Sequence, residues 1–151
     1  MQLHEYSFRM AQPVWETGTA HTMNRTVSFC TDIPLSDLPA GQQIRLAAAA
    51  SCSFVLLVNG QFVAHGPARC AHGFFRVDEY DLTPYLTAQV NRVCLRTAGY
   101  NVNSFSYLNQ PSFLCAELIC GGEVTAFTSG EGFTARLMTE HEEKVERFSF
   151  Q

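Results

Sequence analysis

The alternation of hydrophobic and polar residues predicts β-strands along most of this chain. The strongest signal lies between Phe54 and Gly66, where two apolar runs flank Asn59-Gly60. Asparagine and glycine tolerate the positive φ angles of a type I′ turn, so this dipeptide predicts a two-residue β-hairpin. The hairpin would place an antiparallel unit near the middle of the chain.

One face of the predicted hairpin is wholly apolar and carries Val55, Leu57, Phe62 and Ala64. The turn should pair Leu57 with Phe62 and Val55 with Ala64. Because side chains alternate between the two faces of a strand, we expect this apolar face to lie against the core. A charge at Leu57 or Phe62 should then prevent folding.

Strand-like segments also occur on both sides of the hairpin, at residues 25–30, 44–51, 74–80, 91–100, 113–120, 124–128 and 133–138. The second of these includes four consecutive alanines, which favour helix. Its short length and its β-like neighbours instead predict a strand packed closely against another layer. One helical turn is expected at 81–86. Eight or nine short strands separated by turns predict an all-β antiparallel jelly-roll sandwich.

Length and charge limit the classes of protein to which this chain can belong. The chain has 151 residues, which suits one domain with its own core. Its formal net charge of −4 argues against a nucleic-acid partner, and its single lysine, Lys144, argues against a polybasic membrane-binding patch. The N-terminus lacks the pattern of a signal peptide, so we expect a cytoplasmic protein with no membrane partner.

The chain contains six cysteines without a Cys-x-x-Cys pair, namely Cys30, Cys52, Cys70, Cys94, Cys115 and Cys120. Most of them lie within apolar, strand-like runs. Free cysteine behaves as a small buried hydrophobe, and thiols stay reduced in the cytoplasm. We therefore expect buried free thiols rather than disulfides.

The densest carboxylates in a structured region are Asp78, Glu79 and Asp81. A glycosidase needs two facing carboxylates, but strand alternation points Asp78 and Glu79 to opposite faces, and Asp81 begins a turn. His65, Cys70 and His72 fit no common zinc spacing and have no evident fourth ligand. The sequence thus predicts no catalytic residues, no metal site and no cofactor.

Two loops carry the residue types that bind carbohydrates, which are aromatic rings and planar polar groups. The candidate ligand-binding residues are Arg69 and His72 in one loop, and Tyr100, Asn101, Asn103 and Tyr107 in the other. Loops carry binding functions more often than strands do. We expect these loops to pack against another domain of the same polypeptide, with direct sugar binding as the alternative.

Several motifs in a fixed order resemble a known family. They are the hairpin 58–63, Gly66-Pro67, the turn 80–83 and Asn91-Arg92-Val93. Together they resemble the accessory jelly-roll domains of bacterial α-L-rhamnosidases (glycoside hydrolase family 78) and the wider group of galactose-binding-domain-like sandwiches. The resemblance extends from about residue 13 to the end of the chain.

The resemblance implies a non-catalytic domain whose partner is the catalytic domain of the same polypeptide, with a rhamnose-containing glycan as a further partner. In such enzymes the catalytic carboxylates lie in a separate (α/α) barrel, and this chain is too short to contain one. Segments 1–24, 25–138 and 139–151 would then be a lead-in, the sandwich domain and a link to a downstream domain.

Calcium-dependent rhamnose-binding modules of similar fold carry Pro-Gly-Trp after the hairpin, whereas this chain has Gly66-Pro67-Ala68-Arg69, without a tryptophan. This chain therefore lacks the motif that accompanies the calcium and sugar sites of those modules. A free-standing carbohydrate-binding module is the alternative function, and a small enzyme in its own right is the third.

Overall fold

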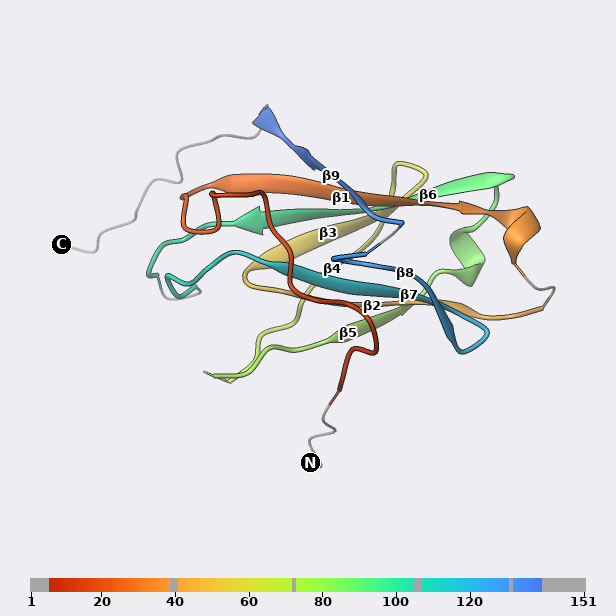
Figure 1. Ribbon diagram of the computed structural model, residues 1–151, viewed down its shortest axis with the longest axis horizontal. Coiled ribbons are helices and arrows are strands. Elements are labelled where there is room, and N and C mark those ends of the chain that lie inside the picture. Colours follow the sequence, from red (N-terminus) through yellow and green to blue (C-terminus); the bar gives the residue numbers. More distant parts are fainter. Residues whose placement is uncertain (1–5, 39–40, 72, 105–106, 131, 140–151) are drawn as a thin grey trace.

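The computed structural model describes residues 6–38, 41–71, 73–104, 107–130 and 132–139, and these form two antiparallel β-sheets packed face to face (Figure 1). Strands of the five-stranded sheet lie in the order β4-β3-β6-β1-β9, and those of the four-stranded sheet in the order β5-β2-β7-β8. The predicted all-β sandwich is confirmed.

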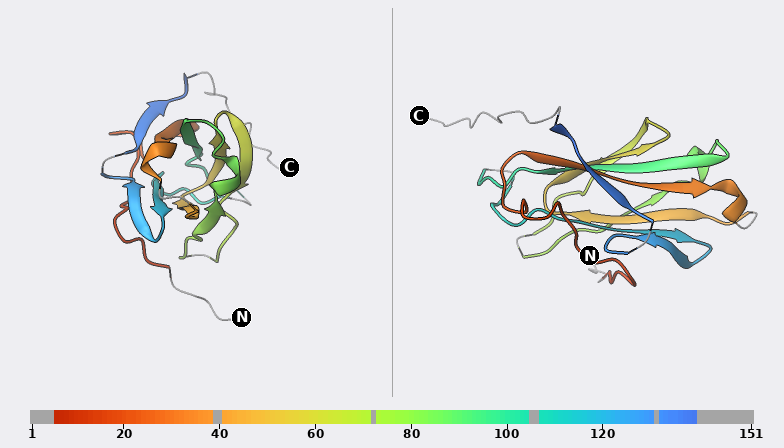
Figure 2. Two further views of the ribbon diagram at one scale, coloured as in Figure 1. Left: turned by 90° about the vertical axis from the view of Figure 1, so that its right-hand side faces the viewer. Right: turned by 45° about the horizontal axis from the view of Figure 1, so that its top comes forward.

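The strands and two short 3-10 helices among the described residues are β1 (Arg25–Pro34), η1 (Leu35–Asp37), β2 (Ile44–Ala50), β3 (Ser53–Val58), β4 (Gln61–Gly66), β5 (Asp78–Asp81), η2 (Thr83–Tyr85), β6 (Val90–Gly99), β7 (Leu114–Cys120), β8 (Glu123–Phe127) and β9 (Thr134–Leu137). The chain crosses repeatedly from one sheet to the other, as jelly rolls do. Figure 2 shows the two layers from the end and from an oblique angle.

The core lies between the inner faces of the two sheets. From β3 it receives Phe54, Leu56 and Val58, each at most 1% exposed. The predicted alanine-rich strand is β2, and its Ala47 and Ala48 are fully buried on opposite faces. Small side chains allow other chain segments to approach both faces of β2 closely, so packing overrides the helical preference of alanine.

The central hairpin forms as predicted. Asn59 and Gly60 have φ angles of 52° and 79°, which is the left-handed region that the turn requires. The turn is also joined to β6, because Asn59 Oδ1 accepts a hydrogen bond from the Arg92 backbone N–H (2.9 Å) and the Asn59 N–H donates to the Arg92 carbonyl (2.8 Å). The asparagine therefore both shapes the turn and fixes the hairpin in the sheet.

The prediction of which hairpin face lies in the core was wrong. Phe62 is 64% exposed, and Leu57, its partner across the strands, lies half-buried on the outer face of the sheet. Both faces of β3 are apolar, so hydrophobicity alone could not distinguish them. An irregularity between Leu56 and Leu57 also shifts the register, so that Val55 pairs with His65 instead of Ala64.

The prediction of free thiols was wrong for two of the six cysteines. Cys30 on β1 and Cys94 on β6 lie directly opposite each other, with Cα atoms 4.2 Å apart, and form a disulfide. The remaining four are free. Cys115 and Cys120 are buried as expected, whereas Cys52 is half-buried and Cys70 is exposed. Disulfides are rare in the cytosol, so this bond weighs against the cytoplasmic location, which stays a prediction.

A membrane-crossing helix is not found among the described residues, since none of their helices has the required length and hydrophobicity.

The N-terminal segment crosses the edge of the four-stranded sheet and is fastened to β7. Val14 forms a β-bridge with Leu114. The carboxylate of Glu117, which is fully buried, accepts hydrogen bonds from the backbone N–H groups of Met10 (2.5 Å) and Ala11 (2.8 Å). Trp15 packs against the core beside Phe29.

The two leucines at positions 56 and 57 provide a direct test of the orientation of β3. Leu56→Asp should abolish cooperative folding, because it buries an unpaired charge in the core. Leu57→Asp should remain folded and lose at most about 2 kcal/mol, because its side chain lies on the outer face. Urea denaturation followed by circular dichroism would measure both. The reverse order of effects would contradict the observed register.

Candidate functional site

Three connections meet at one end of the sandwich, on the left in Figure 1. We call this the loop end, and it consists of the described residues among 51–53, 67–77 and 100–113. Ser51 joins two of the connections, since its Oγ accepts a hydrogen bond from Phe113 N–H (3.1 Å) and its carbonyl accepts one from Gln110 Nε2 (2.9 Å). The third connection, 67–77, contacts the connection 100–113 through the rings of Phe75 and Phe113, whose centroids are 4.8 Å apart.

The structure brings three of the predicted site residues together at the loop end. The rings of Tyr100 and Tyr107 are in contact, with centroids 4.7 Å apart. Burial raises the pKa of the Tyr107 phenol and Tyr100 raises it further, whereas a hydrogen bond with Ser53 and the nearby Arg69 guanidinium act in the opposite direction. Arg69 is exposed in the neighbouring connection of the loop end.

Two other predicted residues, one of them buried and one exposed, make hydrogen bonds within the loop end. Asn101 is 4% exposed and has a positive φ of 48°. Its Nδ2 donates to the Thr22 carbonyl (3.1 Å) and to Ser112 Oγ (2.7 Å), so both amide hydrogens are used inside the protein. The Oδ1 atom of Asn103 accepts a hydrogen bond from the Asn109 N–H (2.8 Å) and closes the loop.

His72, the remaining predicted site residue, lies outside the described residues. Within the described part of the chain, no group of three histidine, cysteine, aspartate or glutamate side chains lies close enough together to hold a metal ion.

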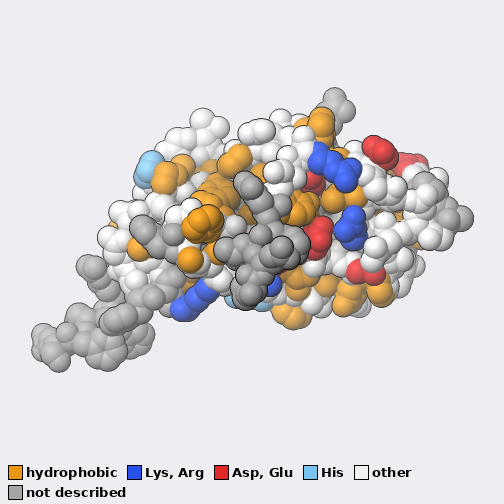
Figure 3. Space-filling view, turned by 90° about the horizontal axis from the view of Figure 1, so that it is seen from below, with side chains coloured by type: hydrophobic (Ala, Val, Ile, Leu, Met, Phe, Trp, Pro, Cys, Tyr) orange, Lys and Arg blue, Asp and Glu red, His pale blue; other side chains and the backbone are white. Residues whose placement is uncertain are grey.

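Sequence reasoning missed the exposed apolar residues of the loop end. Phe74 is 67% exposed, Phe75 is 51% exposed and Leu108 is 48% exposed. The segment 74–77 was expected to be a strand, but β5 begins only at Asp78. Two adjacent phenylalanines directly after Gly73 were the available signal. In Figure 3, acidic side chains lie in the half of the face away from the loop end, whereas hydrophobic side chains occur in both halves.

Asp78 holds the connection between β4 and β5 in place. Its Oδ2 accepts a hydrogen bond from the Ala68 N–H (2.8 Å), and its Oδ1 pairs with Arg76 Nε (2.7 Å).

Burial, followed by the Asp78 charge, raises the pKa of the neighbouring Tyr80 phenol to about 12. Tyr80 packs edge-on against Phe54, and a Cβ on Gly66 would collide with the Tyr80 hydroxyl and the Phe54 ring, so glycine is required there.

The other two carboxylates of the acidic cluster are also held in structural contacts. Glu79 Oε1 lies 3.4 Å from Arg45 Nη1 on the neighbouring strand. Asp81 accepts hydrogen bonds from the Thr83 N–H and from Gln43 Nε2, both at 3.0 Å, and its hydrogen bonds with these two residues lower its pKa. The cluster therefore organises the turn from β5 into η2.

No protein-family model and no curated protein matches this chain. Among solved structures, a family 78 glycoside hydrolase rhamnosidase of Bacillus sp. GL1 is similar over 88% of this chain, with 24% sequence identity and a TM-score of 0.75. A Streptomyces avermitilis alpha-L-rhamnosidase solved with L-rhamnose is similar over 84% of this chain, with 14% identity and a TM-score of 0.48.

This chain spans 14% of the length of the Bacillus chain and 11% of the length of the Streptomyces chain. The first likeness shows that this chain has the fold of a part of that larger enzyme. The fold that the motif resemblance implied is therefore confirmed.

The raised pKa of Tyr80 makes a prediction about alkaline stability. A phenol whose pKa is higher in the folded than in the unfolded protein contributes stability below pH 10, and this contribution is lost as the pH rises toward 12. Tyr80→Phe should therefore unfold less steeply than the wild type between pH 10 and 12. Urea midpoints across that range would show this, with exposed Tyr85→Phe as the control. Parallel curves for the wild type and Tyr80→Phe would refute it.

Proposed function

We propose that this chain is a non-catalytic β-sandwich domain of an α-L-rhamnosidase-like glycoside hydrolase, and that its loop end docks on the catalytic domain of the same polypeptide. The fold likeness supports the first half of this proposal, because the matching region makes up 14% of a rhamnosidase chain. A domain of that relative size would leave most of the enzyme, including a catalytic barrel, elsewhere in the parent.

The exposed aromatic residues of the loop end carry the second half of the proposal. Contiguous apolar surface on a soluble domain is a mark of an interaction site. Phe74, Phe75 and Leu108 expose large apolar side chains at this end, and Arg69 is exposed in the same connection as the two phenylalanines. Aromatic residues and arginine are the residue types that dominate binding energy in protein interfaces.

A non-catalytic role is consistent with the positions of the carboxylates. Asp78, Glu79 and Asp81 are engaged in contacts that stabilise the fold. Glu117 lies fully buried beneath the N-terminal segment, where it binds two backbone N–H groups. None of these four presents a free carboxyl pair of the kind that glycoside hydrolysis needs.

A carbohydrate-binding module is the second candidate, and the contact between Tyr100 and Tyr107 at the end that also exposes Arg69 favours it. Tyrosine rings can stack on the C–H face of a sugar, and a guanidinium can donate to its hydroxyls. In that case a rhamnose-containing oligosaccharide should shift the amide resonances of Tyr100 and Tyr107 and raise the melting temperature.

Docking can be tested by mixing this chain with the separately expressed catalytic polypeptide of its parent and measuring their affinity by calorimetry. We expect a one-to-one complex. Phe74→Ser should weaken the complex at least about tenfold, because an exposed aromatic anchor is lost. The control is Phe62→Ser, since Phe62 has a similar exposed fraction (64% against 67%) but lies on β4, away from the loop end. No association, or an equal loss in both variants, would rule out docking through the loop end.

A further inference from the structure

A pocket of about 350 Å³ opens beside the second half of β1, separate from the loop end. Its position follows from the short length of β9. That strand pairs with β1 only from Val27 to Cys30, whereas β1 continues to Pro34. Beyond Cys30, none of the described strands covers this edge of β1, and the pocket lies there between the two sheets.

The uncovered edge offers backbone groups to a ligand. The carbonyls of Thr26 and Cys30 face β9, since they accept hydrogen bonds from Met138 N–H (2.9 Å) and Thr134 Oγ1 (3.2 Å). Backbone groups of alternate residues in a strand point to the same side. The N–H and carbonyl of Asp32 therefore point toward the open edge.

An unpaired hydroxyl lies in the wall of the pocket. Thr31 is only 4% exposed, and its side chain makes no hydrogen bond within the described residues. Its Oγ1 atom is not among the fully buried side-chain atoms that lack a partner, so this oxygen is accessible from the pocket that Thr31 lines. Gly132 lies next to this hydroxyl, since a Cβ on Gly132 would be 3.8 Å from Thr31 Oγ1, and it has no room for a side chain because the same Cβ would lie 2.7 Å from Ala126 Cβ.

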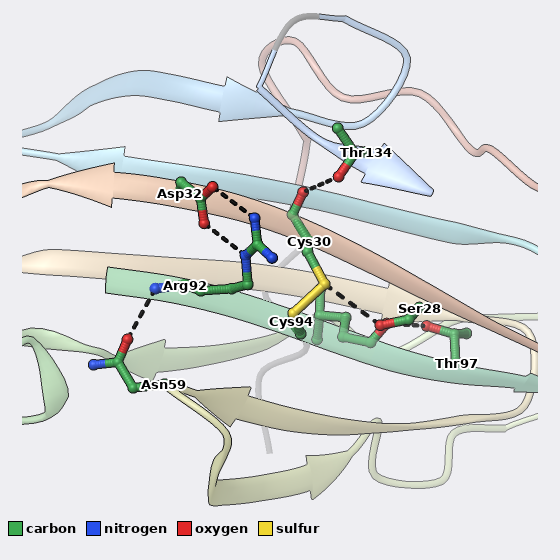
Figure 4. The surroundings of a disulfide bond; sticks show 9 residues. Ser28, Cys30, Asp32, Asn59, Arg92, Cys94, Thr97 and Thr134 are labelled. Atoms are coloured by element: carbon green, nitrogen blue, oxygen red, sulfur yellow. Dashed lines mark hydrogen bonds and ion pairs between the residues drawn. A yellow bond between two sulfur atoms is a disulfide. The ribbon is translucent and has the colours of Figure 1, made fainter. Parts of the chain in front are cut away.

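Charged groups stand at the rim of the pocket. Arg92 and Asp32 form a two-pronged pair, with Nε–Oδ1 and Nη2–Oδ2 distances of 2.8 Å (Figure 4). Asp37 on η1 adds a second carboxylate without a cationic partner among the described residues. The lining therefore carries one guanidinium and two carboxylates, which disfavours an anionic ligand and provides acceptors for hydroxyl groups.

The inner part of the pocket is apolar. Ile33 from β1, Leu118 from β7 and Ala126 from β8 form its floor. A ligand suited to this lining has hydroxyl groups on one side and C–H groups on the other. The volume falls in the range of small-molecule sites, which begins at about 300 Å³.

We propose that this pocket binds one neutral, polyhydroxylated molecule of monosaccharide size. Its hydroxyls would pair with Thr31, Asp37 and the open backbone of Asp32, and its C–H face would rest on Ile33 and Leu118. This site is distinct from the loop end, so its failure would leave the docking proposal intact.

The test is a titration of the full chain with L-rhamnose, D-galactose and D-glucose, followed by amide resonances in ¹H–¹⁵N spectra. We expect saturable shifts at Thr31, Asp32 and Asp37 for at least one sugar, with a dissociation constant on the order of 1 mM. Thr31→Val, which keeps the shape of the side chain, should weaken binding about fivefold, and Asp37→Asn should weaken it by a similar factor.

The control variant is Glu123→Gln, which removes an exposed carboxylate from β8 outside the pocket and should leave the affinity unchanged. The absence of saturable shifts around the pocket with all three sugars would overturn the proposal. Shifts confined to Tyr100 and Tyr107 would also overturn it and would favour sugar binding at the loop end. An unchanged affinity in folded Thr31→Val and Asp37→Asn would exclude these contacts.

Discussion

The ten-residue antiparallel ladder between β1 and β6 is the element on which the other features of this sandwich depend. It lies inside the five-stranded sheet, with the hairpin added on one side and β9 on the other. Its inner face supplies core residues such as Val27, Phe29 and Leu95. Its outer face carries the disulfide and the pair between Asp32 and Arg92, because the register places the two members of each pair opposite each other.

The same ladder determines where the two candidate binding regions lie. At one end β6 leads into the connection that carries Tyr100 and Tyr107, beside the loops that follow β2 and β4. At the other end, β1 extends beyond the last residue that pairs with β9. The uncovered edge of β1 forms one wall of the pocket. Apolar aromatic residues characterise the first region and mixed hydroxyl and carboxylate groups the second. This difference is the reason for proposing different occupants, a protein surface at the loop end and a small polar molecule in the pocket.

Hydrogen bonds from three side chains hold turns, connections and the N-terminal segment against the strands. Asn59 joins the hairpin turn to β6, Asp78 holds the connection between β4 and β5, and Glu117 holds the N-terminal segment against β7. Each uses a side-chain oxygen to satisfy a backbone N–H that no strand partner reaches. Glu117 has a second buried oxygen without a partner among the described residues, which makes this the most costly of the three contacts.

Residues that act through local geometry could be identified from the sequence. The Asn-Gly turn and most of the strands followed from backbone preferences and from periodicity over a few residues. The predicted pairing of Leu57 with Phe62 also held, because a two-residue turn sets the register of its nearest pairs. The choice of core face, the Cys30–Cys94 bond, the burial of Asn101 and the exposure of Phe74 all depend on contacts between segments far apart in the chain. Only tertiary packing could decide them, because two apolar faces of one strand are equivalent until a second sheet covers one of them.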